Sequence, residues 1–579
     1  MIPELLHLFK QHNSTQLVAD IYKPGPGLYL QIHLEQGDQI NTLFIDKDTT
    51  KGDLYHWFAQ AEYSSKLLTM NKAQDPKKKI HSNNYLSIFA KNDILPLPGK
   101  PDYDQLKVNW IESIKRFFQV FLNPKKESIL KTYQLPPIDE DQVLKNQQYL
   151  LDHWDQIEKL IAEYNLPQNT YVKIFFVAPL EVYYQEYQRY VLPKIFNKND
   201  YNIQMNEEIF GLSNYNMGLN TKKPYLESLT TAFRVPFRTS LDDALVLKDI
   251  FEWLSNQRNE EDKNINTVYL PLNFQFQTST NQLDKGMYIY FQRGKETIVK
   301  DFEFLSSKPQ ENFEFEIYNY LNLKDEQDFT FIDNRLVLEK EINQYWYNKQ
   351  LIGSYYAENK ELPKIKLGVV SKNLINLIII SRDAMLSFFR KGNEEPLKNI
   401  IQKIGLELIQ EQIRLTSGLY LWKAQKAYNL WLSFLSYYKK EGSGVMADKL
   451  QQLVQGLENK IDGIDMPYCE CEEEFYFLAG QLTYYLLSQS VSHRKSHSLL
   501  EPFLRVKKGS MLKEKIIQVY ETYGHAIHFN NKAFKRLLSM VMGYDVKSNL
   551  NAYIDIFLAG VMCDNILYRK KEQEEEKKQ

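Results

Sequence analysis

The pattern of apolar residues changes once along this chain, near residue 374, and this change limits the folds open to it. Before it, short runs rich in β-branched and aromatic residues alternate with helical stripes. After it, apolar residues recur almost only at helical spacing. A chain of 579 residues is also too long for one hydrophobic core, because single cores stop growing at about 250–300 residues. We therefore expect an α+β protein, with a mixed α/β N-terminal region followed by an all-helical C-terminal bundle.

The boundary between these two regions is predicted near residues 361–368, where Pro363 interrupts a charged stretch. This gives a mixed body over residues 1–365 and a helical bundle over residues 366–579. In the body, strands are predicted over residues 17–22, 27–34, 40–45, 171–177, 267–276 and 286–291, and helices over residues 103–122 and 241–254. In the bundle, helical stripes cover residues 450–461, 475–486 and 534–541.

Net charge and cysteine content limit the kind of binding surface and the cellular compartment that we expect for the protein. The chain has 71 basic and 73 acidic residues, a formal net charge of −2, so any nucleic-acid site must be a local patch. Three cysteines are too few for a disulfide framework and favour reduced thiols in a cytosolic setting. No signal peptide is recognised at the start of the sequence, and the apolar run over residues 374–380 is far shorter than a membrane span. We expect a cytoplasmic protein without membrane contact.

A search for catalytic motifs finds no phosphate loop, no HExxH and no GxSxG. Cys469 and Cys471, followed by His493 and His497, offer zinc-ligand types, but CxC is not the usual CxxC knuckle and a predicted helix separates the two pairs. Two ordinary thiols and two loop histidines explain the pattern more simply. We expect no catalytic residue, no metal and no cofactor.

One segment with the chemistry of a nucleic-acid contact lies between residues 71 and 100, which hold six lysines and two aspartates. Three consecutive lysines cannot all point into a core, so they must face solvent, where they can neutralise phosphates. The neighbouring histidine and asparagines offer donors and acceptors suited to base edges. A solvated surface loop is the alternative. The candidate residues are Lys72, Lys77, Lys78, Lys79, His81, Asn83 and Asn84.

A second such segment covers residues 214–225 and combines asparagines, lysines and aromatic residues with Gly218. A glycine lets the backbone approach a ligand closely, and the neighbouring side chains can grip a strand. A turn-rich connector is the alternative, because Asn and Gly also serve turns. The candidate residues are Asn214, Asn216, Asn220, Lys222 and Lys223.

The helical region has a basic bias of its own. Residues 491–570 contain 13 Lys and Arg against 6 Asp and Glu. This suits a groove that follows a nucleic-acid backbone, and it equally suits a solvated helical surface.

Several strings in the sequence resemble the Csh-type large subunit of type I-B CRISPR Cascade complexes. They run in order through nearly the whole chain, and the lysine-histidine-asparagine string is the most specific of them. They are DPKKKIHSNNY at residues 75–85, GLNTKKPYL at 218–226, EFYFLAGQL at 474–482, HSLLEPFL at 497–504 and LSMVMGY at 538–544, with shorter matches at 63–65 and 71–72.

The resemblance implies a non-catalytic subunit that reads the protospacer-adjacent motif in duplex DNA and assists strand opening. The implied partners are CRISPR RNA, target DNA, the backbone and foot subunits of the complex, and a helicase-nuclease recruited after target binding. The guide RNA reads the target sequence itself, as in other RNA-guided effectors. The resemblance also implies a small subunit made from an internal start, for which Met446, after a Gly-containing linker, is the best candidate.

Two other classes of function remain open from the sequence. One is a nuclease that uses a carboxylate or metal site without a recognisable motif. The other is a structural adaptor that touches only proteins, against which the lysine-rich segments argue.

Overall fold

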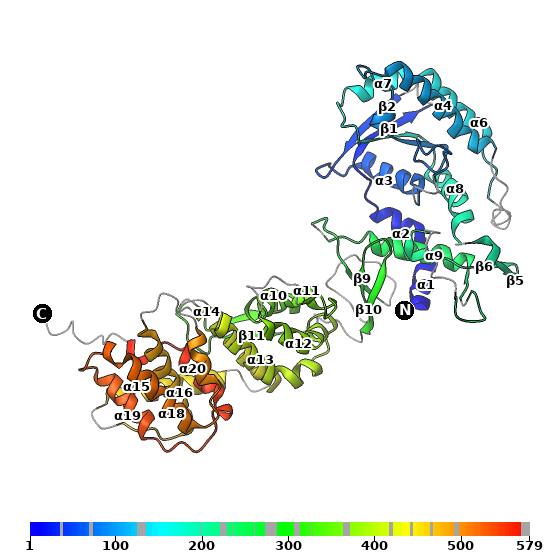
Figure 1. Ribbon diagram of the computed structural model, residues 1–579. Helices are drawn as coiled ribbons and strands as arrows, with labels where there is room; N and C mark the ends of the chain where they lie inside the picture. Colours follow the sequence, from blue (N-terminus) through cyan, green and yellow to red (C-terminus); the bar gives the residue numbers. More distant parts are fainter. Residues whose placement is uncertain are drawn as a thin grey trace. The chain divides into compact units, whose positions relative to one another are not determined.

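The computed structural model describes most of the chain as two compact units (Figure 1). Unit 1 comprises Met1–Tyr269 and Tyr288–Phe302, and unit 2 comprises Leu270–Met287 and Glu303–Gln579. The described residues are 1–34, 39–68, 73–123, 135–196, 198–219, 228–235, 237–259, 261–271, 286–305, 313–324, 326–362, 371–415, 421–439, 444–463, 467–490 and 497–568. Mixed α/β structure followed by helices confirms the predicted α+β class.

A four-stranded sheet with the order β2-β1-β4-β3 forms the centre of unit 1. Its two inner strands pair in parallel, with Gly27 opposite Tyr171, and each outer strand is antiparallel to its neighbour. Both inner strands are buried almost throughout, as expected for strands covered on both faces. The strands are β1 (Gly27–His33), β2 (Gln39–Ile45), β3 (Ser87–Lys91) and β4 (Tyr171–Phe176).

Helices cover both faces of this sheet (Figure 1). On one face, Phe58 of α3 (Asp53–Ser65) packs on Tyr29 and Phe175, with ring centroids 5.1 and 5.4 Å apart. On the other face, the apolar stripe of α4 (Tyr103–Leu122) packs with α6 (Glu140–Asp152) and α7 (Trp154–Ala162). Helix α4 has the predicted bounds.

Four more helices form a layer in the rest of unit 1. It consists of α1 (Ile2–Lys10), α2 (Ser14–Ile21), α8 (Leu180–Val191) and α9 (Leu241–Ser255). Beside α9 lies a small antiparallel sheet of β5 (Ile203–Met205), β6 (Glu208–Gly211) and β7 (Thr239–Ser240). Strands β8 (Thr267–Pro271), β9 (Gly286–Gln292) and β10 (Ile298–Leu305) form a further sheet with the order β10-β9-β8.

The strand predicted over residues 17–22 is wrong, because this segment is part of α2. The Asn13 side chain accepts a hydrogen bond from the Gln16 backbone N–H and caps the helix. Val18 and Ala19 are buried in the resulting helix. The cap chemistry of Asn13 thus outweighs the β-branched character of the segment.

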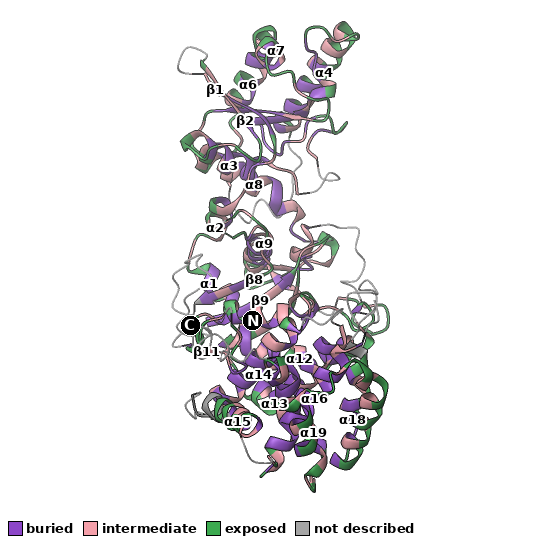
Figure 2. Cartoon of the chain, turned by 90° about the vertical axis from the view of Figure 1, so that its left-hand side faces the viewer, coloured by how far each residue is buried: buried purple, intermediate pink, exposed green. Residues whose placement is uncertain are grey.

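Unit 2 is built on one large apolar cluster that joins a hairpin to the helices. Figure 2 shows buried residues along the inward sides of these helices, while other sides are exposed. The elements are β11 (Phe315–Tyr318), β12 (Phe329–Ile332), α10 (Arg335–Tyr345), α11 (Leu351–Ser354), α12 (Lys372–Lys391), α13 (Glu395–Leu415), α14 (Trp422–Lys439), α15 (Gly444–Asp462), α16 (Glu472–Ser488), α17 (Glu501–Leu504), α18 (Gly509–Tyr523), α19 (Lys532–Gly543) and α20 (Ile554–Met562).

The division between the units falls near residue 303, earlier than the boundary expected near residue 365. The segment in between belongs to the helical core by its packing. Phe315 of β11 lies 4.7 Å from Phe434 of α14, and the Trp346 indole N–H donates to the Ala427 carbonyl at 3.0 Å. The β11–β12 hairpin is therefore part of the helical unit, so the end of strand structure in the sequence does not coincide with the division between the units.

Helices α16 and α20 cross at two glycines. A Cβ on Gly480 would lie 2.3 Å from the Phe557 carbonyl oxygen, and one on Gly560 would lie 2.1 Å from the Phe477 carbonyl oxygen. Only glycine permits this approach of two backbones. The Gln481 amide donates to the Gly560 carbonyl at 2.6 Å, and its oxygen accepts from the Ile566 N–H at 2.8 Å. The EFYFLAGQL string of the sequence is thus a packing motif.

Candidate nucleic-acid interface

The three consecutive lysines lie in a loop, residues 75–80, that is built around one buried carboxylate. We call it the lysine loop. Asp75 accepts hydrogen bonds from the backbone N–H groups of Lys77 at 3.1 Å, Lys79 at 2.5 Å and Ile80 at 3.1 Å. Lys78 adopts the left-handed conformation, with φ of 54°. This backbone turns the three lysine side chains outward, and all three are exposed as predicted.

The Asp75 carboxylate is also tied to the main body of unit 1. Its side chain is 0% exposed and lies 3.0 Å from the guanidinium of Arg116 on α4. Burial raises the pKa of Asp75, but the hydrogen bonds from Arg116 and from the backbone N–H groups of the loop outweigh it and hold the pKa below its usual value. The carboxylate therefore stays ionised, and the loop is fixed before any ligand arrives.

His81 is half-buried and holds the base of the lysine loop with both ring nitrogens, and its expected contact with a base stays a prediction. Its Nε2 donates to the Lys78 carbonyl at 2.9 Å, and its Nδ1 lies 2.8 Å from the Tyr171 hydroxyl. Burial is the main reason that the pKa of His81 is lowered. A neutral ring with one donor and one acceptor matches these two partners.

Asn83 and Asn84 are buried, and the expectation that they contact a nucleic acid is corrected. They are 1% and 0% exposed. The Asn83 amide donates to the Lys66 carbonyl at 2.9 Å. The Asn84 amide donates to the Ser64 carbonyl at 3.2 Å, and its oxygen accepts from the Leu86 N–H at 3.0 Å. Both side chains bind the end of α3 to the segment that follows the lysine loop.

The second predicted segment is partly inside the fold. Asn214 is 1% exposed, so it does not reach the surface, and its assignment as a nucleic-acid contact is corrected too. Asn216 is half-buried, and its carbonyl accepts from the Thr297 N–H at 2.9 Å. Gly218 and Leu219 are both left-handed, with φ of 60° and 58°. Lys72, Asn220, Lys222 and Lys223 lie outside the described residues.

Leu68, three residues before the first segment, and Leu219 of the second segment lie at one apolar cluster. Leu68 and Leu219 both pack on a cluster formed mainly by α8 and α9. The Leu68 N–H also donates to the Tyr190 hydroxyl on α8 at 3.1 Å. Leu68 and Leu219, about 150 residues apart in the sequence, are thus held at one place in unit 1.

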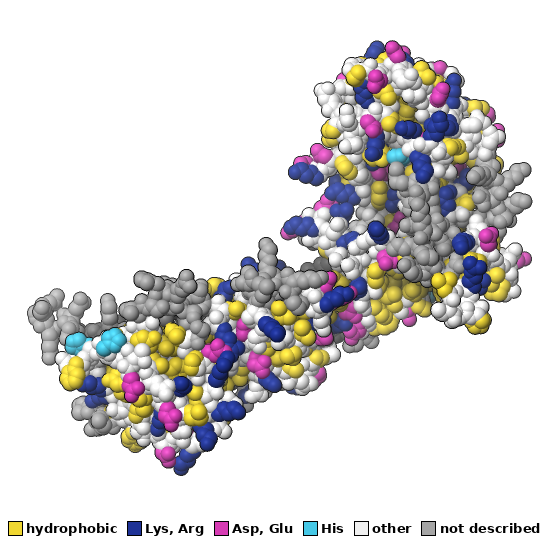
Figure 3. Space-filling view, in the orientation of Figure 1, with side chains coloured by type: hydrophobic (Ala, Val, Ile, Leu, Met, Phe, Trp, Pro, Cys, Tyr) yellow, Lys and Arg dark blue, Asp and Glu magenta, His cyan; other side chains and the backbone are white. Residues whose placement is uncertain are grey.

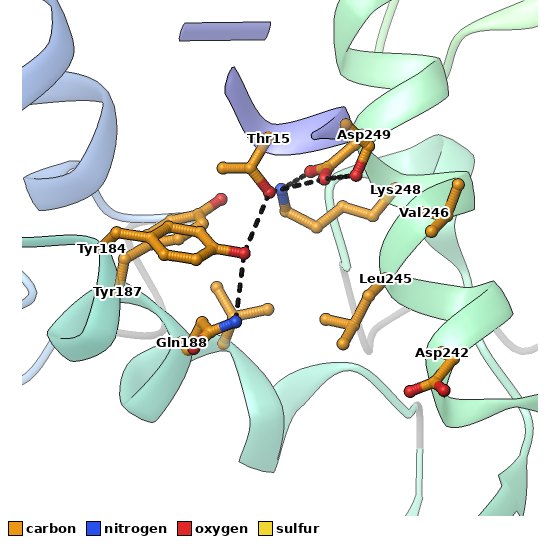
Figure 4. Close-up of a pocket in the computed structure, with 11 residues that line it drawn as sticks. Thr15, Tyr184, Tyr187, Gln188, Asp242, Leu245, Val246, Lys248 and Asp249 are labelled. Atoms are coloured by element: carbon orange, nitrogen blue, oxygen red, sulfur yellow. Dashed lines mark hydrogen bonds and ion pairs between the residues drawn. The ribbon is translucent and has the colours of Figure 1, made fainter. Parts of the chain in front are cut away.

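A cavity of about 220 Å³ lies among α2, α8 and α9 (Figure 4). Its hydrogen bonds form a chain in which the Gln188 amide donates to the Tyr184 hydroxyl at 3.0 Å. That hydroxyl lies 3.3 Å from the Thr15 hydroxyl, which donates to Asp249 at 2.8 Å. Lys248 completes the chain with an ion pair to Asp249 at 3.0 Å. These groups satisfy one another and join three helices.

The lysine of this cavity is neutralised by its own helix. Lys248 also lies 2.9 Å from Glu252, one turn further along α9. Burial raises the pKa of Glu252, but the nearby Lys248 and Lys66 outweigh it and lower the pKa to about 2. The cation is therefore held by two carboxylates and is not available to a phosphate. This cluster was not predicted, although Lys248, Asp249 and Glu252 lie among apolar residues in the second half of the helix.

The first thiol of the zinc-ligand pattern lies in the core of unit 2. Cys469 is buried, its thiol donates to the Met540 carbonyl at 3.5 Å, and burial raises its pKa to about 12. His493 and the His497 side chain lie outside the described residues. Among the residues that the structure describes, no group of three or more His, Cys, Asp and Glu side chains is placed to hold a metal ion. Within the same residues, no helix is long and apolar enough to cross a bilayer.

Basic and acidic side chains are interspersed over the visible faces of both units (Figure 3).

Comparison of the chain with protein-family models, with curated proteins and with solved structures finds no match.

Proposed function

We propose that the protein is the non-catalytic large subunit of a type I-B CRISPR RNA-guided surveillance complex. It recognises the protospacer-adjacent motif in duplex DNA, assists strand opening and helps to recruit the helicase-nuclease. The observation that carries the proposal is the lysine loop. The string with the most specific resemblance is also the segment in which a buried Asp75 presents three exposed lysines.

A preformed loop of this kind suits phosphate binding. The three ammonium groups are presented by a backbone that is already ordered, so binding does not have to order the loop first. Lysines on phosphates position a protein on DNA without reading its sequence. Base reading needs other side chains. Of the five candidate asparagines, Asn83, Asn84 and Asn214 are buried, which leaves Asn216 and Asn220.

The experiment that tests this proposal replaces Lys77, Lys78 and Lys79 together with Ala in the assembled complex. We expect weaker binding to every target, with the slope of log K against log salt reduced by about 0.9 for each phosphate that is no longer neutralised. The matched control removes three other exposed lysines of unit 1, Lys47, Lys51 and Lys263. Wild-type affinity and wild-type slope in the lysine-loop variant would show that the loop is only a solvated surface.

The proposed complex also contains a small subunit, which we propose is translated from Met446 of the same gene. Met446 lies at the start of α15, and the product would contain α15 to α20, including the glycine crossing of α16 and α20. A C-terminal tag should reveal a second product of 134 residues by mass. Met446→Leu should remove that product and leave the full chain, whereas a product that begins at another residue contradicts the assignment.

A further inference from the structure

The hairpin of unit 2 carries exposed aromatic rings on strand β12. Phe329 is 47% exposed and Phe331 is 52% exposed. Alternate side chains of a strand lie on the same face, so these two rings share one face of the hairpin. The Tyr318 ring of β11 stacks on Phe329 there, with centroids 5.7 Å apart. Ile332, on the opposite face, is buried in the core of the unit.

The two outer edges of this hairpin differ. At the edge of β11, side chains of α14 accept hydrogen bonds from the backbone. The Tyr318 N–H donates to the Ser433 hydroxyl at 3.0 Å, and the Leu321 N–H donates to the Asn429 side chain at 3.3 Å. At the edge of β12, no strand pairs with the hairpin among the residues that the structure describes. One edge is therefore covered by a helix, and the other is open.

The register of the hairpin determines which backbone groups lie on the open edge. The Asn319 N–H donates to the Asp328 carbonyl at 2.9 Å. Hydrogen-bonded and non-hydrogen-bonded pairs alternate in an antiparallel ladder, so the next pair, Tyr318 with Phe329, is of the second kind. The same holds two residues further on, at Phe331. The N–H and C=O groups of Phe329 and Phe331 therefore point away from β11, where an added strand can pair with them.

Negative charge predominates on the hairpin. Among the described residues from 313 to 334, five side chains are acidic and one is basic. That basic side chain, Lys324, forms an ion pair with Asp564, and Lys426 of the adjacent α14 forms one with Glu326. Helix α10, which contacts β12, adds two basic and two acidic side chains. The excess of carboxylates on the hairpin is therefore not offset by these neighbours.

Two of these carboxylates lie at the ends of the open strand. Asp328 directly precedes β12, Asp333 directly follows it, and both are exposed. Opposite charges on neighbouring strands stabilise a sheet, and like charges destabilise it. The edge therefore favours a chain with Lys or Arg at the ends of its paired stretch. A second copy of β12 fits less well, because it brings the same carboxylates with it.

We propose that β12 binds an extended basic segment of a partner protein, which joins the hairpin as a third strand. The backbone of the segment pairs with Phe329 and Phe331, and its alternate apolar side chains lie on the two rings. Its basic side chains face Asp328 and Asp333. The inference goes beyond the proposed function and does not depend on it, because the lysine loop belongs to unit 1 and has DNA as its partner.

The test measures binding of the full-length chain to the fluorescein-labelled peptide Lys-Thr-Val-Thr-Val-Lys by fluorescence anisotropy. In the antiparallel orientation, its two valines lie opposite Phe331 and Phe329, and its end lysines lie opposite Asp333 and Asp328. We expect saturable binding, which Phe329→Ala and Phe331→Ala each weaken about two- to fivefold. Asp328→Asn combined with Asp333→Asn should weaken binding about threefold at low salt and reduce its salt dependence.

Modified peptides test the strand pairing without any change to the protein. N-methylation of both valines removes the N–H groups that face β12 and should weaken binding about tenfold or more. N-methylation of both threonines removes N–H groups that face solvent, so this peptide should bind at least five times more tightly than the valine-methylated one. A peptide with Glu at both ends should bind more weakly than the parent peptide, because like charges then face each other.

Matched variants elsewhere in unit 2 control for exposed rings and exposed charge in general. Phe529 is 81% exposed, and Phe529→Ala should leave peptide binding unchanged. Glu358→Gln combined with Asp383→Asn removes two other exposed carboxylates and should also leave it unchanged. The midpoint of thermal unfolding checks that each variant keeps its fold.

Each contrary outcome has a definite meaning. Absence of peptide binding, or equal loss on methylation of valines and threonines, overturns the inference. Equal effects of Phe529→Ala and Phe331→Ala overturn it too. A wild-type dimer that Phe331→Ala converts to a monomer assigns the edge to a second copy and likewise overturns it. None of these outcomes touches the proposed function, whose test measures DNA binding by the lysine-loop variant.

Discussion

The elements inside unit 1 and the elements inside unit 2 are joined by contacts of different physical kinds. In unit 1, α3 is joined to the central sheet by a buried ion pair, in which Lys173 lies 2.7 Å from Glu62 and both side chains are under 10% exposed. The Tyr29 hydroxyl also donates to Glu62. In unit 2, α16 and α20 meet through Gly480 and Gly560, where two backbones touch. The contact of α3 with the sheet therefore depends on charge balance, and the contact of α16 with α20 depends on the absence of side chains.

This difference predicts how each unit fails. A buried charge that loses its partner keeps its full desolvation cost, whereas a crowded helix crossing can relax by a small shift. Loss of the Lys173 cation should therefore unfold unit 1 selectively, and a side chain at Gly480 should unfold unit 2 selectively. The three predictions below test that contrast.

The largest effect is expected for Lys173→Met, which leaves the Glu62 carboxylate buried without its cation. Loss of one partner of a buried pair costs about 3–5 kcal/mol. We expect amide hydrogens of unit 1 to exchange at lower urea concentration, while α16 in unit 2 keeps its protection. The double variant Glu62→Met with Lys173→Met should recover most of the loss. A single variant with an unchanged unfolding midpoint in unit 1 would contradict the prediction.

An intermediate effect is expected for Gly480→Ala in unit 2. The new Cβ would lie 2.3 Å from a backbone oxygen, and backbone cannot rotate away as a side chain can. Overpacking of this kind costs about 1–3 kcal/mol. Gly456→Ala on α15 is the matched control, because no atom lies within 4 Å of its Cβ position. It should stabilise the helix by about 0.5–1 kcal/mol. Equal effects of the two substitutions on the free energy of unfolding would contradict the close packing of α16 on α20.

The smallest effect is expected from acidification. Glu252 of unit 1 has a folded pKa of about 2, so it contributes stability that is complete above its unfolded pKa of about 4.3 and is lost as pH falls toward 2. Burial is the main reason that the pKa of Glu339 on α10 of unit 2 is raised, so its protonation favours that fold as pH falls toward the unfolded pKa of about 4.3, and at lower pH this contribution does not change. Hydrogen exchange at pH 5 and pH 3 should show α9 losing protection relative to α10. Glu252→Gln should reduce this dependence, and an equal loss in both helices would contradict the contrast.

Much of the fold follows from local sequence pattern. The stripe of Trp110, Ile114, Phe117 and Phe121 has helical spacing, and it set the bounds of α4 correctly. The strands β1, β2 and β4 follow from β-branched and aromatic runs between turns. The residue 303 division could not be predicted, because it depends on which core the β11–β12 hairpin joins.

The candidate site was predictable only in part. Three adjacent lysines must reach solvent, and they do. Asparagine amides are different, because the same donors and acceptors can serve the protein's own backbone or a ligand. Asn83 and Asn84 serve the backbone, and sequence alone does not reveal that choice. An aspartate before a proline predicts only a turn, whereas the three N–H bonds that Asp75 accepts organise the whole loop.

The topology of the central sheet has a consequence for how the chain is made. Strand β1 pairs with β2, which follows it directly. Its other edge stays unpaired until β4 has been synthesised, because Gly27 pairs with Tyr171. Until then the growing chain carries an apolar strand with an open edge, which is a template for association with other chains. In unit 2, α12, α13 and α14 contact their neighbours in sequence and can pack as they appear. Refolding from denaturant should therefore be slow, and prone to aggregation, in the half of the protein that is synthesised first.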